Sequence, residues 1–117
     1  MSLSDLGLIG NCQLSALVRR DGAIVWSCMP RFDSPSVFAK LLDEREGGAF
    51  TIAPADGRTG VQRYLPNTNV LETLFEGPDG AFRILDFAPG SSSTNVAFNR
   101  PSSCASSSLL AVPLAFA

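Results

Sequence analysis

Two short apolar runs open the pattern of hydrophobic and polar positions along the chain. The runs Leu14 to Arg19 and Ala23 to Cys28 flank the turn sequence Arg20-Asp21-Gly22. Asp-Gly between two apolar runs is a strong signal for a β-hairpin, because these residues tolerate the backbone angles of a tight turn. Apolar side chains occupy alternate and consecutive positions, which is typical of strands covered on both faces.

The segment from Ser34 to Gly48 carries the signals of a short helix. Ser34 can accept an unpaired N–H at a helix start, and Pro35 has no N–H to leave unpaired. A short apolar stripe at helical spacing follows, formed by Val37, Phe38, Leu41 and Leu42. Gly47-Gly48 would end the helix. A strand is predicted next, from Phe50 to Ala53, and Pro54 would stop it.

A second hairpin is predicted from Val70 to Phe87. Its strands run from Val70 to Glu76 and from Ala81 to Phe87, and Gly77-Pro78-Asp79-Gly80 forms the turn. On one face of this hairpin lie Leu71, Thr73 and Phe75, with Phe82, Ile84 and Asp86 sharing a face of the other strand. Four to six short strands with one short helix predict a mainly β fold, a partial antiparallel β-sandwich.

The composition changes abruptly at Gly90. All eleven carboxylates lie at or before Asp86, and Arg100 is the only charged residue in residues 90–117. Eight of these 28 residues are Ser, and neither a helical nor an alternating period runs through them. We therefore expect two parts: an incomplete β-sandwich over residues 1–89 and a disordered Ser-rich coil over residues 90–117.

Composition and charge exclude several functions. The formal net charge is −2, so the sequence does not favour a nucleic-acid partner. The chain has no His, which removes the commonest general base and metal ligand, and we expect neither a metal nor a cofactor. No apolar run approaches the length of about 20 residues that spans a bilayer, so no membrane partner is expected. Three widely spaced cysteines favour reduced thiols, and Met1 to Leu8 lacks the positive charge typical of a signal peptide, so we expect a cytoplasmic protein.

Any catalysis would have to rest on carboxylates, and a glycosidase needs two of them on either side of the scissile bond. The candidates are Asp33, Asp43, Glu44, Glu46, Asp56, Glu72 and Asp86. No pair is favoured by spacing, so no catalytic residue is assigned. Trp26 lies in the middle of a predicted strand, where a core position is more common than a sugar-binding platform.

The loop Pro30-Arg31-Phe32-Asp33-Ser34 holds two opposite charges around a phenylalanine. Arg31 and Asp33 can form an internal salt bridge or turn that fixes the crossing to the next element. Alternatively, they can present a polar loop to a ligand or to a neighbouring domain. The residues by themselves leave both interpretations open.

Five blocks in the first 89 residues resemble the N-terminal region of bacterial proteins of glycoside hydrolase family fifteen, the glucoamylase and trehalase type. The blocks are L-G-L-I-G-N-C-Q-L-S-A-L-V (Leu6 to Val18), R-D-G-A-I-V-W-S-C-M-P-R-F-D-S-P-S-V-F-A-K-L-L-D (Arg20 to Asp43), G-G-A-F-T-I-A-P (Gly47 to Pro54), R-Y-L-P-N-T-N-V-L-E-T-L-F (Arg63 to Phe75) and P-D-G-A-F-R-I-L-D-F-A-P (Pro78 to Pro89). They cover about three quarters of the chain in the expected order.

The resemblance implies an N-terminal β-sandwich that precedes a longer catalytic (α/α)6 barrel. Such enzymes hydrolyse α-glucosides with inversion, using two Glu residues of the barrel that have no counterpart here. The chain is therefore expected to be inactive alone and to meet an α-glucoside only through the parent enzyme, with the barrel supplied in cis or in trans. Pro30, Arg31, Phe32, Asp33 and Ser34 match a motif expected to contact the barrel or the substrate pocket.

The Ser-rich segment departs from the family pattern, and a frameshift would explain it. Read one base out of phase with permissible codons, S-S-S-T-N-V-A-F-N can conceal F-E-Q-H-E-R-G-F, and P-S-S-C-A-S-S-S can conceal A-E-L-V-R-I-V. Both hidden strings resemble the continuation of the family. The alternatives are a genuine divergent segment and, for the whole chain, a stand-alone β-sandwich module that binds carbohydrate or another protein.

Overall fold

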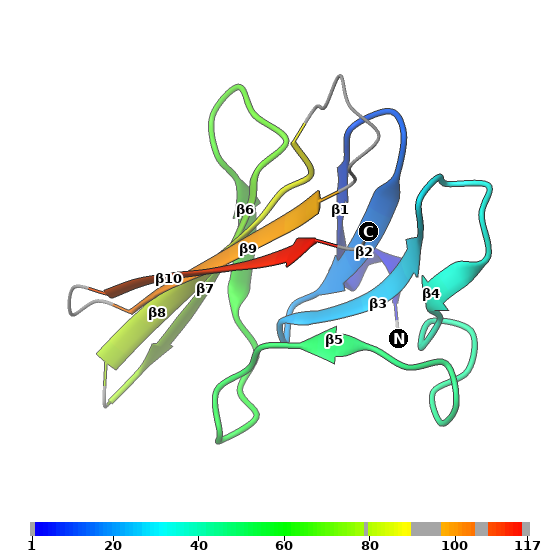
Figure 1. Cartoon of the computed structure of the whole chain (residues 1–117). Helices are drawn as coiled ribbons and strands as arrows, with labels where there is room; N and C mark the ends of the chain where they lie inside the picture. The colour runs from blue at the N-terminus through cyan, green and yellow to red at the C-terminus, as the bar shows by residue number, and fades with distance from the viewer. Residues whose placement is uncertain (1, 79, 90–96, 105–107, 116–117) are drawn as a thin grey trace.

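The computed structural model describes residues 2–78, 80–89, 97–104 and 108–115 and arranges them in two antiparallel sheets (Figure 1). The first sheet has the order β1-β2-β3-β4, and β5 also pairs with β3. The second sheet has the order β10-β9-β8-β7-β6. The strands are β1 (Leu6–Gly10), β2 (Ser15–Arg19), β3 (Ala23–Cys28), β4 (Ser36–Phe38), β5 (Phe50–Thr51), β6 (Val61–Tyr64), β7 (Leu71–Gly77), β8 (Gly80–Asp86), β9 (Ala97–Cys104) and β10 (Ser108–Ala115). The mainly β, antiparallel architecture predicted from the sequence is confirmed.

The first predicted hairpin is formed by β2 and β3, and its turn needs a glycine. Gly22 has a φ of +84°, and a Cβ added there would lie 2.0 Å from the carbonyl oxygen of Ile52. Both the backbone angle and the close approach therefore favour glycine. Nearly every side chain of β3 is buried, with Trp26 half-buried, which agrees with a strand covered on both faces.

The second predicted hairpin is formed by β7 and β8, which pair from Leu71 with Asp86 to Gly77 with Gly80. The face that carries Leu71, Thr73 and Phe75 is buried, as alternation along the strand predicts. Phe75 is fully buried and stacks on Phe82 with 4.8 Å between the ring centroids.

The predicted helix between Ser34 and Gly48 is wrong. Ser36–Phe38 form β4, which pairs with the end of β3, and turns occupy most of the segment up to Gly47. A bond from the Asp43 N–H to the Ala39 carbonyl, 3.1 Å long, closes a single turn that does not continue. Phe38 packs against the core from β4 while Leu42 is 76% exposed, so the residues of the stripe do not share one buried face, and strand pairing outweighs the weak local helix signal. Within the described residues the only helix is the 3-10 helix η1 (Leu3–Asp5).

The second sheet extends into the Ser-rich segment. β9 pairs with β8, and β10 pairs with β9, where the sequence predicted coil. Antiparallel pairing uses backbone groups, so it does not require the alternating side-chain pattern that sequence reasoning looks for. Residues 90–96, 105–107 and 116–117 of the predicted coil lie outside the described residues.

The two sheets are joined by side chains of β6 that reach the first sheet. The hydrophobic core cluster consists of Ile9, Leu14, Ala16, Val18, Ile24 and Leu71, from both sheets. At its margin the Gln62 amide donates to the Val18 carbonyl at 3.2 Å. The Tyr64 hydroxyl donates to the Leu8 carbonyl at 2.7 Å and accepts from the Leu8 N–H at 2.9 Å. Tyr64 thereby satisfies backbone groups on the outer edge of β1, which has no strand partner on that side within the described chain.

Tyr64→Phe tests this connection between the sheets. The ring stays, but both Leu8 backbone groups lose their protein partner and must bond to water, so we expect the free energy of unfolding to fall by about 0.5–1.5 kcal/mol. Urea denaturation would measure the change as a lower midpoint. Ser36→Ala is the matched control, because Ser36 is exposed on β4 and its hydroxyl makes no hydrogen bond to any described residue. An equal midpoint for Tyr64→Phe and the wild type would show that the two bonds do not stabilise the fold.

Candidate functional site

The loop from Pro30 to Ser34, singled out by the sequence, is a compact turn after β3. Its first peptide bond, Met29–Pro30, is cis. The Arg31 N–H donates to the Ser34 hydroxyl at 3.2 Å, and the Ser34 N–H donates back to the Arg31 carbonyl at 3.1 Å. The Phe32 N–H donates to the Gln13 carbonyl at 3.0 Å, which ties this loop to the turn between β1 and β2.

Arg31 and Asp33 form the internal ion pair that the sequence allowed. Nε of Arg31 lies 3.0 Å from Oδ1 of Asp33, and Nη2 lies 3.2 Å from Oδ2, so the contact is bidentate. Both side chains are more than half exposed, and exposed pairs of this kind add little stability. The main consequence is that the loop presents two charges that neutralise each other.

An apolar hollow of about 440 Å³ lies beside this loop. Leu8, Phe32 and Tyr64 line it and are 55%, 62% and 48% exposed, so three large side chains present apolar surface around one hollow. Cys12 and Asn69 also line it. The hollow therefore joins β1, the β1–β2 turn, the Pro30–Ser34 loop and the connection between β6 and β7.

Local hydrogen bonds hold these turns in place. Oδ1 of Asn11 accepts from the backbone N–H groups of Gln13 and Leu14, both at 3.0 Å. The Asn11 amide also donates to the Pro89 carbonyl at 2.9 Å. Cys12 and Asn67 have positive φ angles, which fits the sharp reversals on which they lie.

We call residues 11–14, 29–35 and 65–70 the three-loop end; these connections meet around the hollow on the upper side of the sandwich in Figure 1. Arg31 and Asp33 are their only charged residues. The three-loop end therefore has no net charge. Sequence reasoning found only the Pro30–Ser34 part, because Leu8, Tyr64 and Asn69 carry no local signal.

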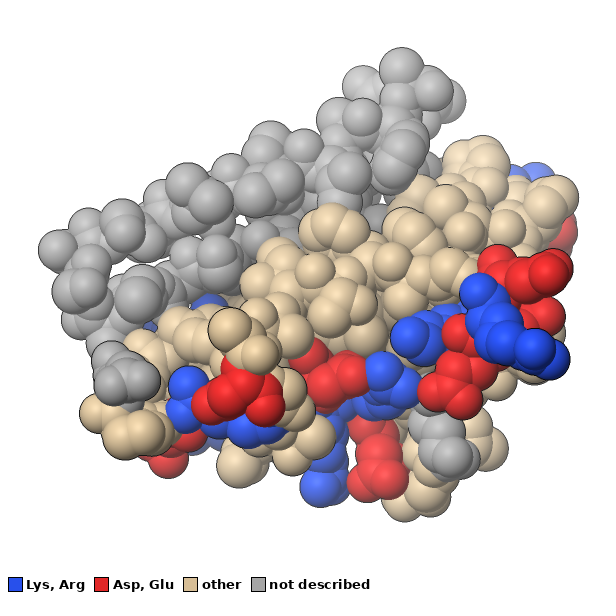
Figure 2. Space-filling view, turned by 90° about the horizontal axis from the view of Figure 1, so that it is seen from below, with Lys and Arg blue, Asp and Glu red and all other residues tan. Residues whose placement is uncertain are grey.

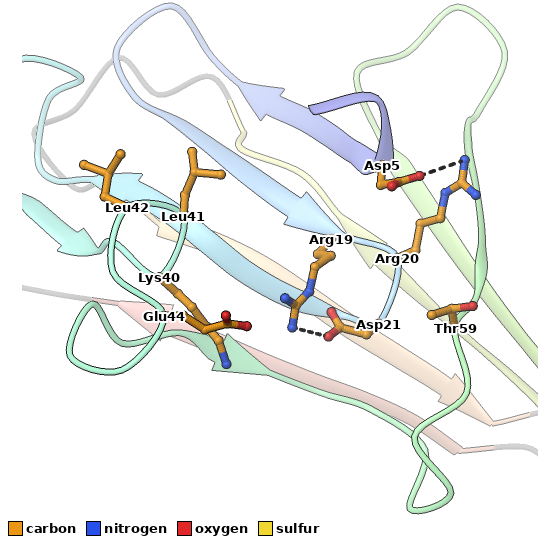
Figure 3. A pocket seen from close by; sticks show the side chains of 9 residues that line it. All are labelled: Asp5, Arg19, Arg20, Asp21, Lys40, Leu41, Leu42, Glu44 and Thr59. Atoms are coloured by element: carbon orange, nitrogen blue, oxygen red, sulfur yellow. Dashed lines mark hydrogen bonds and ion pairs between the residues drawn. The ribbon is translucent and has the colours of Figure 1, made fainter. Parts of the chain in front are cut away.

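The opposite side of the molecule is strongly polar. Figure 2 shows Lys and Arg side chains interspersed with Asp and Glu along this face. A second hollow, of about 780 Å³, lies here and is drawn in Figure 3. We call it the charged hollow; its charged lining residues are Asp5, Arg19, Arg20, Asp21, Lys40 and Glu44.

One ion pair of the charged hollow is tight and one is loose. The Arg19 guanidinium donates to the Asp21 carboxylate (Figure 3), whereas Nη2 of Arg20 lies 3.8 Å from Oδ1 of Asp5. Burial acts to raise the pKa of Asp21, but the hydrogen bonds from Arg19 and the Ala23 N–H, together with the positive charge of Arg19, lower it below its usual value. The same bond raises the pKa of Arg19.

Most of the candidate carboxylates have structural partners. Glu72 is buried between Arg63 and Arg83, at 2.6 Å and 3.1 Å. Asp43 accepts two backbone N–H groups, from Glu46 and Arg45, which lower its pKa. Asp56 pairs with Arg58, and Asp33 pairs with Arg31. Within the described residues no group of three His, Cys, Asp or Glu side chains could hold a metal ion. No helix among the same residues could cross a membrane.

Because Glu72 is paired with two arginines, its carboxylate should make the stability of the protein depend on pH in acid. Burial alone would raise the pKa of Glu72, but the hydrogen bonds from Arg63 and Arg83 lower it below the usual value. A group whose pKa is lowered by folding stabilises the native state above its unfolded pKa, about 4.3, and this contribution is lost as the pH falls through the folded pKa. We expect the free energy of unfolding to drop in acid, and Glu72→Gln to flatten that dependence. Equal pH slopes for the variant and the wild type would contradict this.

Comparison with known proteins agrees with this architecture. The model of the family described as "Trehalase-like, N-terminal" matches residues 1–99, so the match continues past the change in composition at Gly90. Trehalase 1 of Sulfolobus acidocaldarius is 45% identical over 89 residues, which are 76% of this chain and 16% of that protein. The trehalase of Thermoplasma volcanium is 41% identical over 96 residues, and that of Mycolicibacterium smegmatis is 35% identical over 85 residues. These regions are 79% and 72% of this chain and 15% and 13% of the relatives.

The chain therefore belongs to the trehalase-like N-terminal domain family. It spans about a sixth of the length of the curated relatives it matches. No solved structure matches it.

Proposed function

We propose that this chain acts as the non-catalytic N-terminal domain of an α-glucoside hydrolase of the glucoamylase and trehalase type, glycoside hydrolase family fifteen. The observation that carries the proposal is the family match over residues 1–99, together with relatives named trehalases that are several times longer. Most candidate carboxylates already take part in ion pairs or turns. This supports the proposal that the chain has no catalytic acid and base of its own.

In the proposed enzyme the chemistry resides in an (α/α)6 barrel outside this chain. Two Glu residues of the barrel would hydrolyse the α-glycosidic bond with inversion, one protonating the leaving oxygen and the other activating a water on the opposite face. The barrel would be joined to this domain in cis or supplied in trans. We further propose a cytoplasmic location, which the odd, widely spaced cysteines favour.

The three-loop end is the proposed contact with the barrel. Its loops have no net charge, and Phe32, Leu8 and Tyr64 expose apolar surface around one hollow. Covering such a surface with a second protein surface is favourable, because apolar area is removed from water. Arg31 and Asp33 would then serve as contact or pocket-wall residues, because their bidentate pair fixes the shape of the loop.

The test is to combine this chain with the remainder of a related trehalase from which the matching N-terminal region has been removed. Trehalose and maltooligosaccharide hydrolysis and co-purification are the readouts. We expect no hydrolysis by this chain alone, and co-purification with gained hydrolysis when both parts are present. Hydrolysis by this chain alone, or two parts that never associate, would refute the proposal.

Two matched variants locate the contact. Phe32→Ala removes an exposed apolar side chain from the three-loop end, whereas Leu42→Ala removes one from the opposite side, where it lines the charged hollow. Because a few central apolar residues carry most of an interface, we expect Phe32→Ala to weaken association by roughly tenfold or more. Leu42→Ala should leave it unchanged. The reverse result would place the contact on the other side of the sandwich.

A further inference from the structure

The charged lining residues of the charged hollow balance, so its net charge favours neither an anion nor a cation. Arg19, Arg20 and Lys40 contribute three positive charges, and Asp5, Asp21 and Glu44 contribute three negative ones. A net anion would face three carboxylates, and a net cation would face three basic groups. The hollow, at about 780 Å³, also lies within the size range of about 300–1,000 Å³ of small-molecule sites.

Two of the charged side chains are hydrogen-bonded to each other, and the other four have no hydrogen-bond partner among the described residues. Arg19 and Asp21 are hydrogen-bonded to each other, and Asp21 also accepts from the Ala23 N–H. Four side chains make no hydrogen bond to any described residue, and they are Asp5, Arg20, Lys40 and Glu44. The 3.8 Å separation of Arg20 from Asp5 is too long for a hydrogen bond. Two donor groups and two acceptor groups thus remain unsatisfied by the described protein.

The walls that carry these groups are held by the backbone. Lys40 and Glu44 lie on the turn after β4, where the Leu41 N–H donates to the Val25 carbonyl at 3.0 Å and the Lys40 N–H to the Gly48 carbonyl at 3.1 Å. Across the hollow, the Arg20 carbonyl accepts from the Gly60 N–H at 2.8 Å. These bonds fix the backbone of the walls, so mainly the side chains would have to be ordered when a ligand binds. Leu42, 76% exposed, adds apolar surface to the same lining.

We propose that the charged hollow is a binding site for a neutral sugar of mono- or disaccharide size. A sugar hydroxyl donates one hydrogen bond and accepts others, so adjacent hydroxyls can bond to Lys40 or Arg20 and to Glu44 or Asp5 at the same time. The carbon-bound hydrogens of a pyranose ring can pack on Leu42. Charge-assisted hydrogen bonds are the stronger kind, and a neutral ligand can form them without unbalancing the site. The site lies opposite the three-loop end and does not require the proposed contact with the barrel.

The test is a titration of the ¹⁵N-labelled chain with trehalose, maltose and glucose, followed by amide chemical shifts. We expect saturable shifts at residues 19–21, 40–44 and 59, in the millimolar range, with no change at residues 30–34. Lys40→Met and Glu44→Gln should each weaken binding by roughly tenfold, because each removes one charged hydrogen-bond partner. Glu76→Gln is the matched control, because it neutralises an exposed carboxylate on β7, outside the hollow.

Three outcomes would overturn the assignment. The first is the absence of saturable shifts with all three sugars, which would mean a hollow filled by solvent only. The second is sugar binding that Lys40→Met and Glu44→Gln leave unchanged, or that shifts only residues of the three-loop end. The third is binding of inorganic phosphate or acetate as tight as that of the sugars, which would identify an anion site. None of these results bears on association with a catalytic barrel, so the two proposals succeed or fail separately.

Discussion

Phe75→Ala is expected to destabilise the chain by about 3–5 kcal/mol. Phe75 is completely buried and stacks on Phe82, so the substitution removes a large apolar side chain and leaves a cavity. Small domains are stable by only about 5–15 kcal/mol, so this loss takes a large part of the total. Guanidinium or urea denaturation followed by circular dichroism would show a much lower midpoint, or a chain already unfolded without denaturant.

Phe32→Ala is the control for that experiment, because the same atoms are removed from a side chain that is 62% exposed. Surface substitutions of this kind usually change the free energy of unfolding by less than about 0.5 kcal/mol. The two variants together separate burial from residue type. If both lowered the midpoint equally, the sandwich interior around Phe75 would not be packed as described.

The second large effect is expected at the buried carboxylate of Glu72. The double variant Arg63→Met and Arg83→Met keeps the aliphatic cover over Glu72 but removes both of its ionic partners. Because Arg63 and Arg83 are themselves 68% and 50% exposed, Glu72 lies near the surface, and leaving its charge without a partner should cost about 1–3 kcal/mol. We therefore expect the double variant to unfold at a much lower denaturant concentration at neutral pH, and to be less affected in acid, where Glu72 becomes protonated.

Adding Glu72→Gln to this double variant removes the buried charge, and part of the lost stability should return. This partial recovery distinguishes the charge effect from simple loss of packing by the arginine side chains. Arg45→Met is the surface control, because no ion pair involves the Arg45 side chain among the described residues. A triple variant no more stable than the double variant would contradict the role assigned to Glu72.

The two hairpins could be predicted from the sequence because their signals are local. Asp21-Gly22 determines a turn within a few residues, and the buried side of β7 follows from alternation at Leu71, Thr73 and Phe75. Both signals act between neighbours in the chain. The mainly β fold class followed from these two hairpins with little further information.

The remaining elements depend on pairing between distant segments. The turn after Pro35 has helical spacing of apolar residues, but β3 offers backbone groups to Ser36 and Phe38, and the strand forms instead. β6 is largely exposed and is defined only by pairing with β7. In the Ser-rich segment, β9 is defined in the same way by β8. None of these partners can be recognised from local composition.

Prediction of the candidate site was partial for the same reason. The Pro30–Ser34 loop stood out because two charges and a proline are adjacent in sequence. Tyr64 and Leu8 lie 56 residues apart, and nothing local indicates that they meet at one hollow. The charged hollow was missed because its residues come from separate segments: Arg20 lies in a predicted turn, and Glu44 was considered only as a candidate carboxylate.

The tether from Asn11 to Pro89 has a consequence for how the protein folds. The two residues are separated by 78 positions, and Leu8 and Tyr64 by 56, whereas each hairpin closes within a few residues. Contacts between distant segments form late, so these bonds should be absent from the folding transition state. Tyr64→Phe should then accelerate unfolding more than it slows folding. During synthesis at about 5–20 residues per second, the first turn must wait about 4 seconds or longer for its partner to leave the ribosome.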